Sequence, residues 1–172
     1  IELNNKLKNK KIAIIGAGVS NLPLIEYMAK LSSNIVLFDM KELSKEANDL
    51  VNKYNIETSL GVNYLQNLKG FDYIFRSPSC LPTNPYIKKE IDRGAIVTTE
   101  VEEVIKLSPC KVIGITGSDG KTTTTTLISK VLAGLGYNVH TGGNIGTPIF
   151  VDMDKVKEDD IIVLELSSFQ LR

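Results

Sequence analysis

The stretch GITGSDGKTTTTTL (114–127) joins an apolar, β-branched run to a segment of helical pattern. Two glycines at its centre, Gly117 and Gly120, allow the backbone to fold around an anion with successive N–H groups pointing inward. Lys121 follows and can reach the β- and γ-phosphates of a nucleotide, while the Thr122 hydroxyl can bind Mg²⁺. The stretch therefore predicts a phosphate-binding loop between a strand and a helix, at the start of a P-loop-type α/β ATPase domain.

The spacing departs from the general phosphate-loop pattern, which has a glycine five residues before Gly120. Ile115 occupies that position here, and the glycine stands at Gly117 instead. A chance Gly-Lys-Thr turn is the alternative, but the strand–loop–helix context favours a nucleotide site. The residues predicted to bind the nucleotide are Gly117, Ser118, Asp119, Gly120, Lys121, Thr122 and Thr123. No role follows from the sequence for the other three threonines (124–126).

A carboxylate stands at the end of a second apolar run, DIIVLELSS (160–168), which predicts a buried strand. Glu165 would lie at the carboxyl end of that strand, where open α/β sheets bind ligands. Glu165 and Thr122 are the candidate magnesium ligands, although a surface or helix-capping carboxylate is the alternative. The loop TGGNIGTP (141–148) has glycines for close approach and an amide donor and acceptor in Asn144, but an ordinary glycine turn has the same composition.

A further glycine motif, GAGVSN (16–21), also joins an apolar run to a helical pattern. Gly16 and Gly18 suit a tight turn and close approach to a ligand, and Asn21 stands where a third glycine is expected. Asp39 ends the next apolar run, at the position of a ribose ligand. The motif predicts a nucleotide or nucleotide diphosphate at a helix N-terminus. Taken alone, it would equally fit a turn without a ligand or a nicotinamide-dependent dehydrogenase.

Apolar runs and helical patterns alternate along the chain, which predicts mostly parallel sheets with buried strands. Strands are expected at 11–16, 34–39, 72–78, 95–99, 111–117 and 160–168, with a short strand or loop at 137–143. Helices are expected at 22–31, 41–54, 85–93, 99–109 and 121–135. We expect a Rossmann-like domain at 1–97 and the truncated first part of an ATP-binding domain at 98–172.

The composition gives no electrostatic reason to expect nucleic acid or membrane as a partner. Among the 172 residues, 20 are Lys or Arg and 20 are Asp or Glu, and no apolar run is long enough to span a membrane. Cys80 and Cys110 lack disulfide or metal spacing and are interpreted as reduced thiols of a cytoplasmic protein. Arg76 is expected to be a surface charge, and the single histidine, His140, a structural residue.

Three segments occur together in one order: TGSDGKTT (116–123), GGNIGTP (142–148) and ELSSFQL (165–171). They resemble the Mur ligases, which build the peptidoglycan precursor, and the last segment is most similar to the branch that adds D-glutamate. The resemblance covers nearly the whole chain. It implies a monomeric, three-domain ligase that uses ATP and Mg²⁺ to join D-glutamate to UDP-N-acetylmuramoyl-L-alanine through an acyl phosphate.

The resemblance also implies roles for single residues. The catalytic residues would be Lys121, Glu165 and Asn144, with Thr122 and Glu165 on the metal. The substrate would contact Val19, Ser20 and Asp39 at its UDP end, and Asn144, Ser167 and Gln170 at its sugar–peptide end. Because the family's remaining magnesium-site residues and its D-glutamate domain lie beyond Arg172, residues 1–172 alone are expected to be inactive. A sibling ligase for another amino acid and a non-catalytic nucleotide-binding module are the alternatives.

Overall fold

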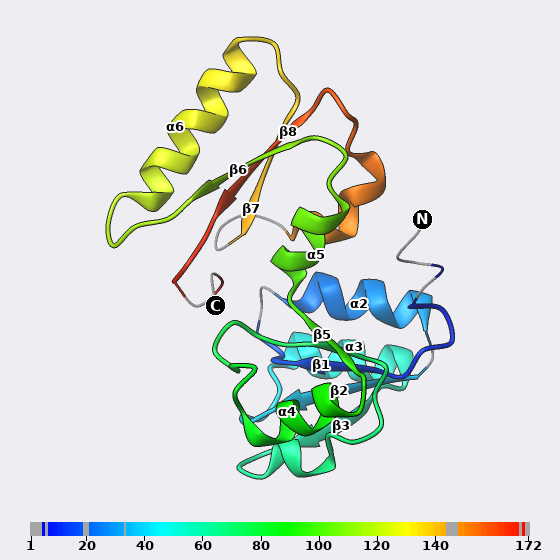
Figure 1. The fold of residues 1–172 in the computed structure, drawn as a ribbon. Helices are drawn as coiled ribbons and strands as arrows, with labels where there is room; N and C mark the ends of the chain where they lie inside the picture. Colours follow the sequence, from blue (N-terminus) through cyan, green and yellow to red (C-terminus); the bar gives the residue numbers. More distant parts are fainter. Residues whose placement is uncertain are drawn as a thin grey trace. The chain divides into compact units, whose positions relative to one another are not determined.

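The computed structural model describes residues 5, 7–18, 21–32, 34–143, 148–168 and 170. The chain divides into two compact units, Ile1–Thr99 and Glu100–Arg172. Both are built on parallel sheets with helices between the strands (Figure 1). The α/β fold class is therefore confirmed. No helix in the described part of the chain is both long and apolar enough to cross a membrane.

The sheet of the first unit has five parallel strands in the order β3-β2-β1-β4-β5. The strands are β1 (Ile12–Ile15), β2 (Ile35–Asp39), β3 (Glu57–Leu60), β4 (Tyr73–Phe75) and β5 (Ile96–Thr98). The Rossmann sheet has this order with a sixth strand added, and it binds nucleotides at the point at which the strand order reverses. Here that point lies between β1 and β4, beside the glycine motif that follows β1.

Helices cover both faces of this sheet (Figure 1). They are α2 (Leu22–Leu31), α3 (Lys45–Tyr54), the 3₁₀ helix η2 (Tyr64–Asn67) and α4 (Pro85–Asp92). One face packs Ala13, Ile15, Val36, Phe38 and Ile74 against Leu65 of η2 and Ile87 of α4. The alternate strand residues point to the opposite face, which α2 and α3 cover. Because both faces are buried, β1 is apolar at every position rather than at alternate ones.

An edge strand and the start of a helix in the first unit differ from the predictions. The strand β3 was not predicted, because it is a short, mostly exposed edge strand of sequence ETSL without an apolar run. The helix predicted at 41–54 begins only at Lys45, because Ser44 caps it by accepting the N–H of Ala47 at 3.2 Å. Asn55 ends it in the left-handed conformation.

The second unit has three described parallel strands in the order β6-β8-β7. They are β6 (Lys111–Ile115), β7 (Val139–Gly143) and β8 (Ile161–Glu165), and β8 is buried along its whole length. The helix α6 (Lys121–Gly134) packs Ile128 and Leu132 on one face of the sheet. On the other side, α5 (Glu100–Leu107) packs against the 3₁₀ helix η3 (Ile149–Lys155), and Glu100 accepts the N–H of Phe150 at 3.1 Å.

Candidate functional site

Side-chain hydrogen bonds hold both the carbonyl and the N–H of the peptide unit between Gly16 and Ala17. The Gly16 carbonyl accepts a hydrogen bond from Nδ2 of Asn21 at 3.0 Å, and the Ala17 N–H donates to Oδ2 of Asp39 at 2.7 Å. Asp39 ends β2 and also accepts the N–H of Lys41 at 2.8 Å. The carboxylate predicted to contact the UDP end of a substrate therefore also ties the glycine loop to the neighbouring strand. It keeps capacity for further donors, because a carboxylate offers about four acceptor positions.

Gly16 is needed for its conformation and for its close packing. Its φ is +104°, and a Cβ at this position would lie 3.1 Å from Cβ of Ser77. Its N–H donates to the Phe38 carbonyl at 2.8 Å, which extends the pairing of β1 with β2 by one residue. The loops that follow β1, β2 and β4 therefore meet at one edge of the sheet, where open α/β sheets bind their ligands.

A cavity of about 380 Å³ opens at this edge. Its lining includes Gly16, Gly18, Asp39, Tyr64, Ser77 and Ser79. A second cavity of about 420 Å³ shares Met40, Tyr64 and Ser79 with it. The volumes are within the range of ligand-binding clefts, which is about 300–1,000 Å³. Of the predicted contact residues, Asp39 lines the first cavity, whereas Val19 and Ser20 lie outside the described residues.

Tyr64 lines both cavities and Cys80 lines the second. Sequence reasoning missed Tyr64 because no motif surrounds it. Burial, with Cys80 next in effect, raises the pKa of Tyr64 to about 12, so its phenol stays a hydrogen-bond donor. Burial also raises the pKa of the Cys80 thiol. Arg76 was expected at the surface, but this prediction was wrong. Arg76 is 4% exposed, and its Nη1 donates to the Cys80 carbonyl at 3.4 Å.

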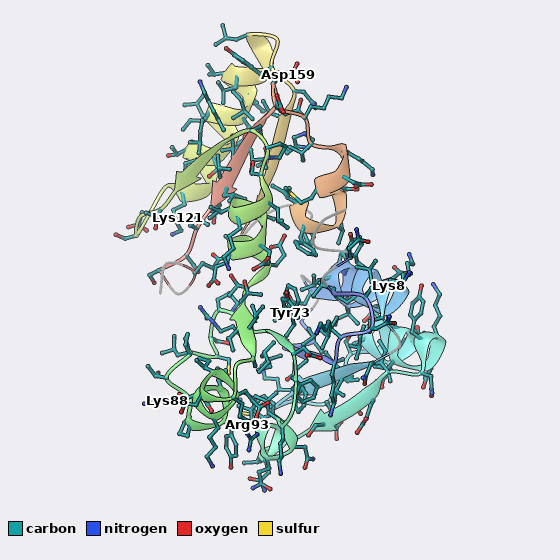
Figure 2. All side chains as sticks on the ribbon, turned by 45° about the vertical axis from the view of Figure 1, so that its right-hand side comes forward. Lys8, Tyr73, Lys88, Arg93, Lys121 and Asp159 are labelled. Atoms are coloured by element: carbon teal, nitrogen blue, oxygen red, sulfur yellow. The ribbon has the colours of Figure 1, made fainter. Side chains whose placement is uncertain are left out.

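The phosphate loop of the second unit is exposed. Gly120 has a φ of +71° and is the N-cap of α6, and Gly117 has a φ of +152°. Ser118 and Asp119 lie between these glycines, while Lys121, Thr122 and Thr123 form the first turn of α6. Lys121, labelled in Figure 2, donates through Nζ to the carbonyls of Gly117 at 2.7 Å and Ser118 at 3.1 Å. The ammonium group is thus held against the loop, at the N-terminus of a helix with no acidic residue in its first turn.

The predicted metal ligands lie in direct contact. The Thr122 hydroxyl donates to Oε2 of Glu165 at 2.8 Å. Glu165 is 2% exposed at the end of the central strand β8, and its burial rules against the surface alternative. A hydroxyl and a carboxylate suit Mg²⁺, which is held by few protein oxygens together with water and phosphate. Within the described residues no group of three His, Cys, Asp or Glu side chains is placed to hold a metal.

Gly143 makes the position of Glu165 possible. It pairs with Glu165 in the β7–β8 register, its φ is +92°, and a Cβ on it would lie 2.3 Å from the Glu165 carbonyl oxygen. A side chain there would collide with backbone, which cannot move as a side chain can. The predicted glycine-rich loop therefore contains one glycine, Gly143, that the close approach of the Glu165 backbone requires. Asn144, predicted as catalytic and substrate-binding, lies outside the described residues.

Ser167 and Gln170, both predicted to line the substrate site, hold each other in a turn after β8. The Ser167 N–H donates to Oε1 of Gln170 at 2.7 Å, and the Gln170 N–H donates to the Ser167 carbonyl at 3.0 Å. His140, to which no catalytic role was given, bonds Oδ2 of Asp160 at 2.8 Å near the start of β8. Its place at the amino ends of the strands is consistent with a structural role.

The parallel sheets, the clamped glycine loop and the exposed Gly-Lys-Thr loop with its buried carboxylate define a class of nucleotide-binding α/β proteins. Two family models match the chain: the Mur ligase MurD-like N-terminal domain at residues 10–99, and the Mur ligase middle domain at residues 115–172. The chain belongs to the Mur ligase family.

Individual relatives agree with this assignment. The chain is 48% identical over 173 aligned residues to a UDP-N-acetylmuramoylalanine–D-glutamate ligase of Clostridium novyi, covering 99% of this chain. It is 49% identical to the protein of that name from Clostridium tetani. In both comparisons the chain spans only 38% of the relative's length.

Solved structures show the same fold at low identity. The murein ligase MPL of Neisseria meningitides, a UDP-N-acetylmuramate:L-alanyl-γ-D-glutamyl-meso-diaminopimelate ligase, matches with a TM-score of 0.54 and 20% identity, over 91% of this chain and 52% of that protein. The UDP-N-acetylmuramate–alanine ligase of Thermotoga maritima matches with a TM-score of 0.52 and 22% identity, over 92% of this chain and 37% of that protein.

Proposed function

We propose that the full-length protein containing this chain is an ATP-dependent ligase that adds D-glutamate to UDP-N-acetylmuramoyl-L-alanine. Residues 1–97 would bind the UDP end of the substrate, and residues 98–172 would form the first part of the ATP-binding domain. The observation that carries the proposal is the 2.8 Å contact between Thr122 and Glu165 beside the phosphate loop. The names of the relatives that are 48–49% identical support D-glutamate as the amino acid.

The first unit supports a role in substrate binding. Its clamped loop and 380 Å³ cavity lie at the edge where a Rossmann-like sheet binds nucleotides. Asp39, and with it Val19 and Ser20 in the loop after β1, would contact the uridine diphosphate. The first unit would thus hold a substrate handle rather than a nicotinamide cofactor, so no specific NADH binding is expected.

The second unit supports phosphoryl transfer. Gly117, Ser118, Asp119, Gly120, Lys121, Thr122 and Thr123 would bind ATP. Lys121 carries the positive charge that offsets the charge developing on the γ-phosphate, because its ammonium group lies within the loop at 2.7 Å from the Gly117 carbonyl. Thr122 and Glu165 would hold Mg²⁺, which supplies further neutralisation of phosphate charge when bound.

The reaction would proceed in two steps. A carboxylate oxygen of the substrate L-alanine attacks the γ-phosphorus, and ADP leaves, which gives an acyl phosphate. The D-glutamate amine then attacks the acyl carbon, phosphate leaves, and the nitrogen loses a proton as the amide forms. Asn144, Ser167 and Gln170 would position the sugar–peptide part of the substrate. Positioning and charge stabilisation account for most of the rate in such transfers.

Phosphate release by the full-length protein tests this function. We expect release from ATP only when UDP-N-acetylmuramoyl-L-alanine and D-glutamate are both present. L-lysine or meso-diaminopimelate in place of D-glutamate is the matched control, and neither should support release. Equal release with another amino acid would assign the protein to a sibling specificity. ATP binding without release under any combination would instead indicate a non-catalytic nucleotide-binding module.

A further inference from the structure

Asn21 occupies the N-cap position of α2, but its side chain does not hydrogen-bond to the first turn of the helix. An N-cap asparagine ordinarily accepts a backbone N–H of the first helical turn through its side-chain oxygen. Asn84 does this at the start of α4, where Oδ1 accepts the N–H of Tyr86 at 3.0 Å. The Asn21 side chain makes no such bond. Its Nδ2 instead donates to the Gly16 carbonyl, five residues back, at 3.0 Å.

This bond has a counterpart on the same peptide unit. Asn21 binds the carbonyl of the Gly16–Ala17 peptide, and Asp39 binds its N–H at 2.7 Å. This peptide turns about ψ of Gly16 and φ of Ala17, and Gly16, which has no Cβ, restricts the turn less than another residue would. Rotation of this peptide would break both hydrogen bonds at once. The two side chains therefore fix one orientation of the loop, in which the Gly16 carbonyl is turned towards Asn21.

The orientation matters for an anion at this edge of the sheet. A carbonyl oxygen turned into the cavity would repel a diphosphate, whereas the N–H groups at the start of α2 attract it. The N-cap side chain, Asn21, does not cap α2, and the described first turn of the helix has no acidic residue. Because the Asn21 amide binds the loop and not the helix, the Gly16 carbonyl has a partner and the N–H groups at the start of α2 stay available to an anion.

We propose that Asn21 is a positioning residue for the diphosphate of the UDP-linked substrate. Together with Asp39 it locks the Gly16–Ala17 peptide, so that the Gly16 carbonyl oxygen stays hydrogen-bonded to Asn21 and is not free to face the anion. This inference rests on the proposed function, because it assumes that the first unit binds UDP. It also explains why a residue other than glycine stands at position 21: the side chain replaces the tight packing of the third glycine with a hydrogen bond.

The test compares three substitutions of Asn21 in the full-length protein, measuring UDP binding by calorimetry and ligation kinetics. In Asn21→Ala, UDP affinity should fall about tenfold, the loss expected for one hydrogen bond and a freed peptide. The KM for UDP-N-acetylmuramoyl-L-alanine should rise by a similar factor while kcat stays unchanged. A residue that served folding alone would change the melting temperature without this separation of KM from kcat.

Two further variants keep the test independent of folding. Asn21→Asp has the same shape but lacks the donor and adds negative charge, so it should bind UDP more weakly than Asn21→Ala. Asn21→Gly restores the fingerprint glycine and should bind UDP as weakly as Asn21→Ala. The matched control is Asn48→Ala, which removes an exposed Nδ2 bond to the Leu43 carbonyl, also five residues back, at 3.1 Å. It should leave UDP affinity unchanged.

The outcomes separate this inference from the proposed function. Wild-type protein that binds neither UDP nor the UDP-linked substrate would overturn both. Wild-type protein that binds UDP, with Asn21→Gly or Asn21→Ala binding equally tightly, would overturn the positioning role alone. A loss in Asn48→Ala as large as that in Asn21→Ala would also contradict it.

Discussion

The two glycine loops of this chain follow the first strand of a parallel sheet, yet they are held in different ways. The loop after β1 has no charged residue of its own, and side chains from neighbouring segments, Asn21 and Asp39, bind both sides of one peptide. The loop after β6 is exposed and carries its own cation, Lys121, whose ammonium group binds the carbonyls of the loop itself.

The difference indicates two ways in which a glycine loop can bind a phosphate group. A loop held by its surroundings presents N–H groups in a fixed arrangement, which suits a substrate handle that is bound but not altered. A loop with its own lysine and a hydroxyl–carboxylate pair brings movable charge to a phosphate whose bonds change. Under the proposed function, the same local pattern, strand–glycines–helix, serves binding in one unit and chemistry in the other.

The largest expected effect lies in the second loop. In the full-length protein, Thr122→Ala and Glu165→Gln should each lower the rate of ligation at least about 100-fold, because each would remove one of the two proposed oxygen ligands of Mg²⁺. The double variant should be little worse than the Glu165 variant, since residues that act as a unit are not additive. Steady-state phosphate release measures all three. Independent, multiplicative losses would break the pairing inferred from their 2.8 Å contact.

The next effect tests the close approach that positions Glu165. Gly143→Ala should destabilise the protein by about 2 kcal/mol or more. The new Cβ would collide with the backbone of Glu165, and the alanine would have to adopt a positive φ. Gly136→Ala is the matched control: its φ is also +92°, but nothing lies within 4 Å of its Cβ position. It should cost about 1 kcal/mol. Urea unfolding followed by circular dichroism gives both values, and equal losses would contradict the role of the Glu165 carbonyl contact.

A smaller effect concerns pH and the far end of the second sheet. The Lys157 N–H, followed by His140, holds the pKa of Asp160 at about 2, below its ordinary value of 3.8. A lowered carboxyl pKa stabilises the fold above pH 4, and this contribution is lost as the pH falls from about 4 to 2. Asp160→Asn should therefore lower the melting temperature at pH 7, and the difference from wild type should vanish near pH 2.

Melting curves between pH 7 and pH 2 check this sign. His140→Ala should have a smaller effect than Asp160→Asn, because it removes only the second cause of the shift. Neither substitution should change the ligation rate at neutral pH once the protein is folded. A loss of activity in His140→Ala at full stability would require a catalytic role for this histidine.

The smallest effect concerns Thr125, a threonine of α6 for which no role was predicted. Thr125 is fully buried, and its Oγ1 has no hydrogen-bond partner among the described residues. Thr125→Val keeps the shape and removes the unpaired hydroxyl, so it should stabilise the protein by up to about 1 kcal/mol without changing activity. Thermal unfolding and phosphate release measure the two properties. Destabilisation by valine would mean that the hydroxyl does have a partner.

The sequence predicted the parts of both loops that depend on local spacing. The helix at Leu22–Leu31 and the strands that precede the two glycine motifs were correctly located, because their apolar patterns and turn residues are local signals. The strand β3 carried no such signal. Neither did the burial of Arg76, which depends on a carbonyl four residues away in a folded turn.

The long-range contacts that position Asp39 and Gly143 could not be predicted, because they join residues far apart in the chain, and the short-range bond of Asn21 has no signature in the sequence. Asp39 was predicted as a ligand contact from its spacing, but its bond to Ala17 depends on the pairing of β1 with β2. Asn21 was noted only as a missing glycine. Gly143 lay in a predicted glycine loop, yet its need for glycine comes from Glu165 across the sheet.

The most direct test of the two-loop account measures UDP and ATP binding to the full-length protein and to its Lys121→Ala and Asn21→Ala variants. The account predicts that Lys121→Ala weakens ATP binding at least about tenfold and leaves UDP binding unchanged. Asn21→Ala should weaken UDP binding about tenfold and leave ATP binding unchanged. If Lys121→Ala weakened UDP binding as much as ATP binding, or left ATP binding intact, the assignment of the two loops to two different nucleotides would be wrong.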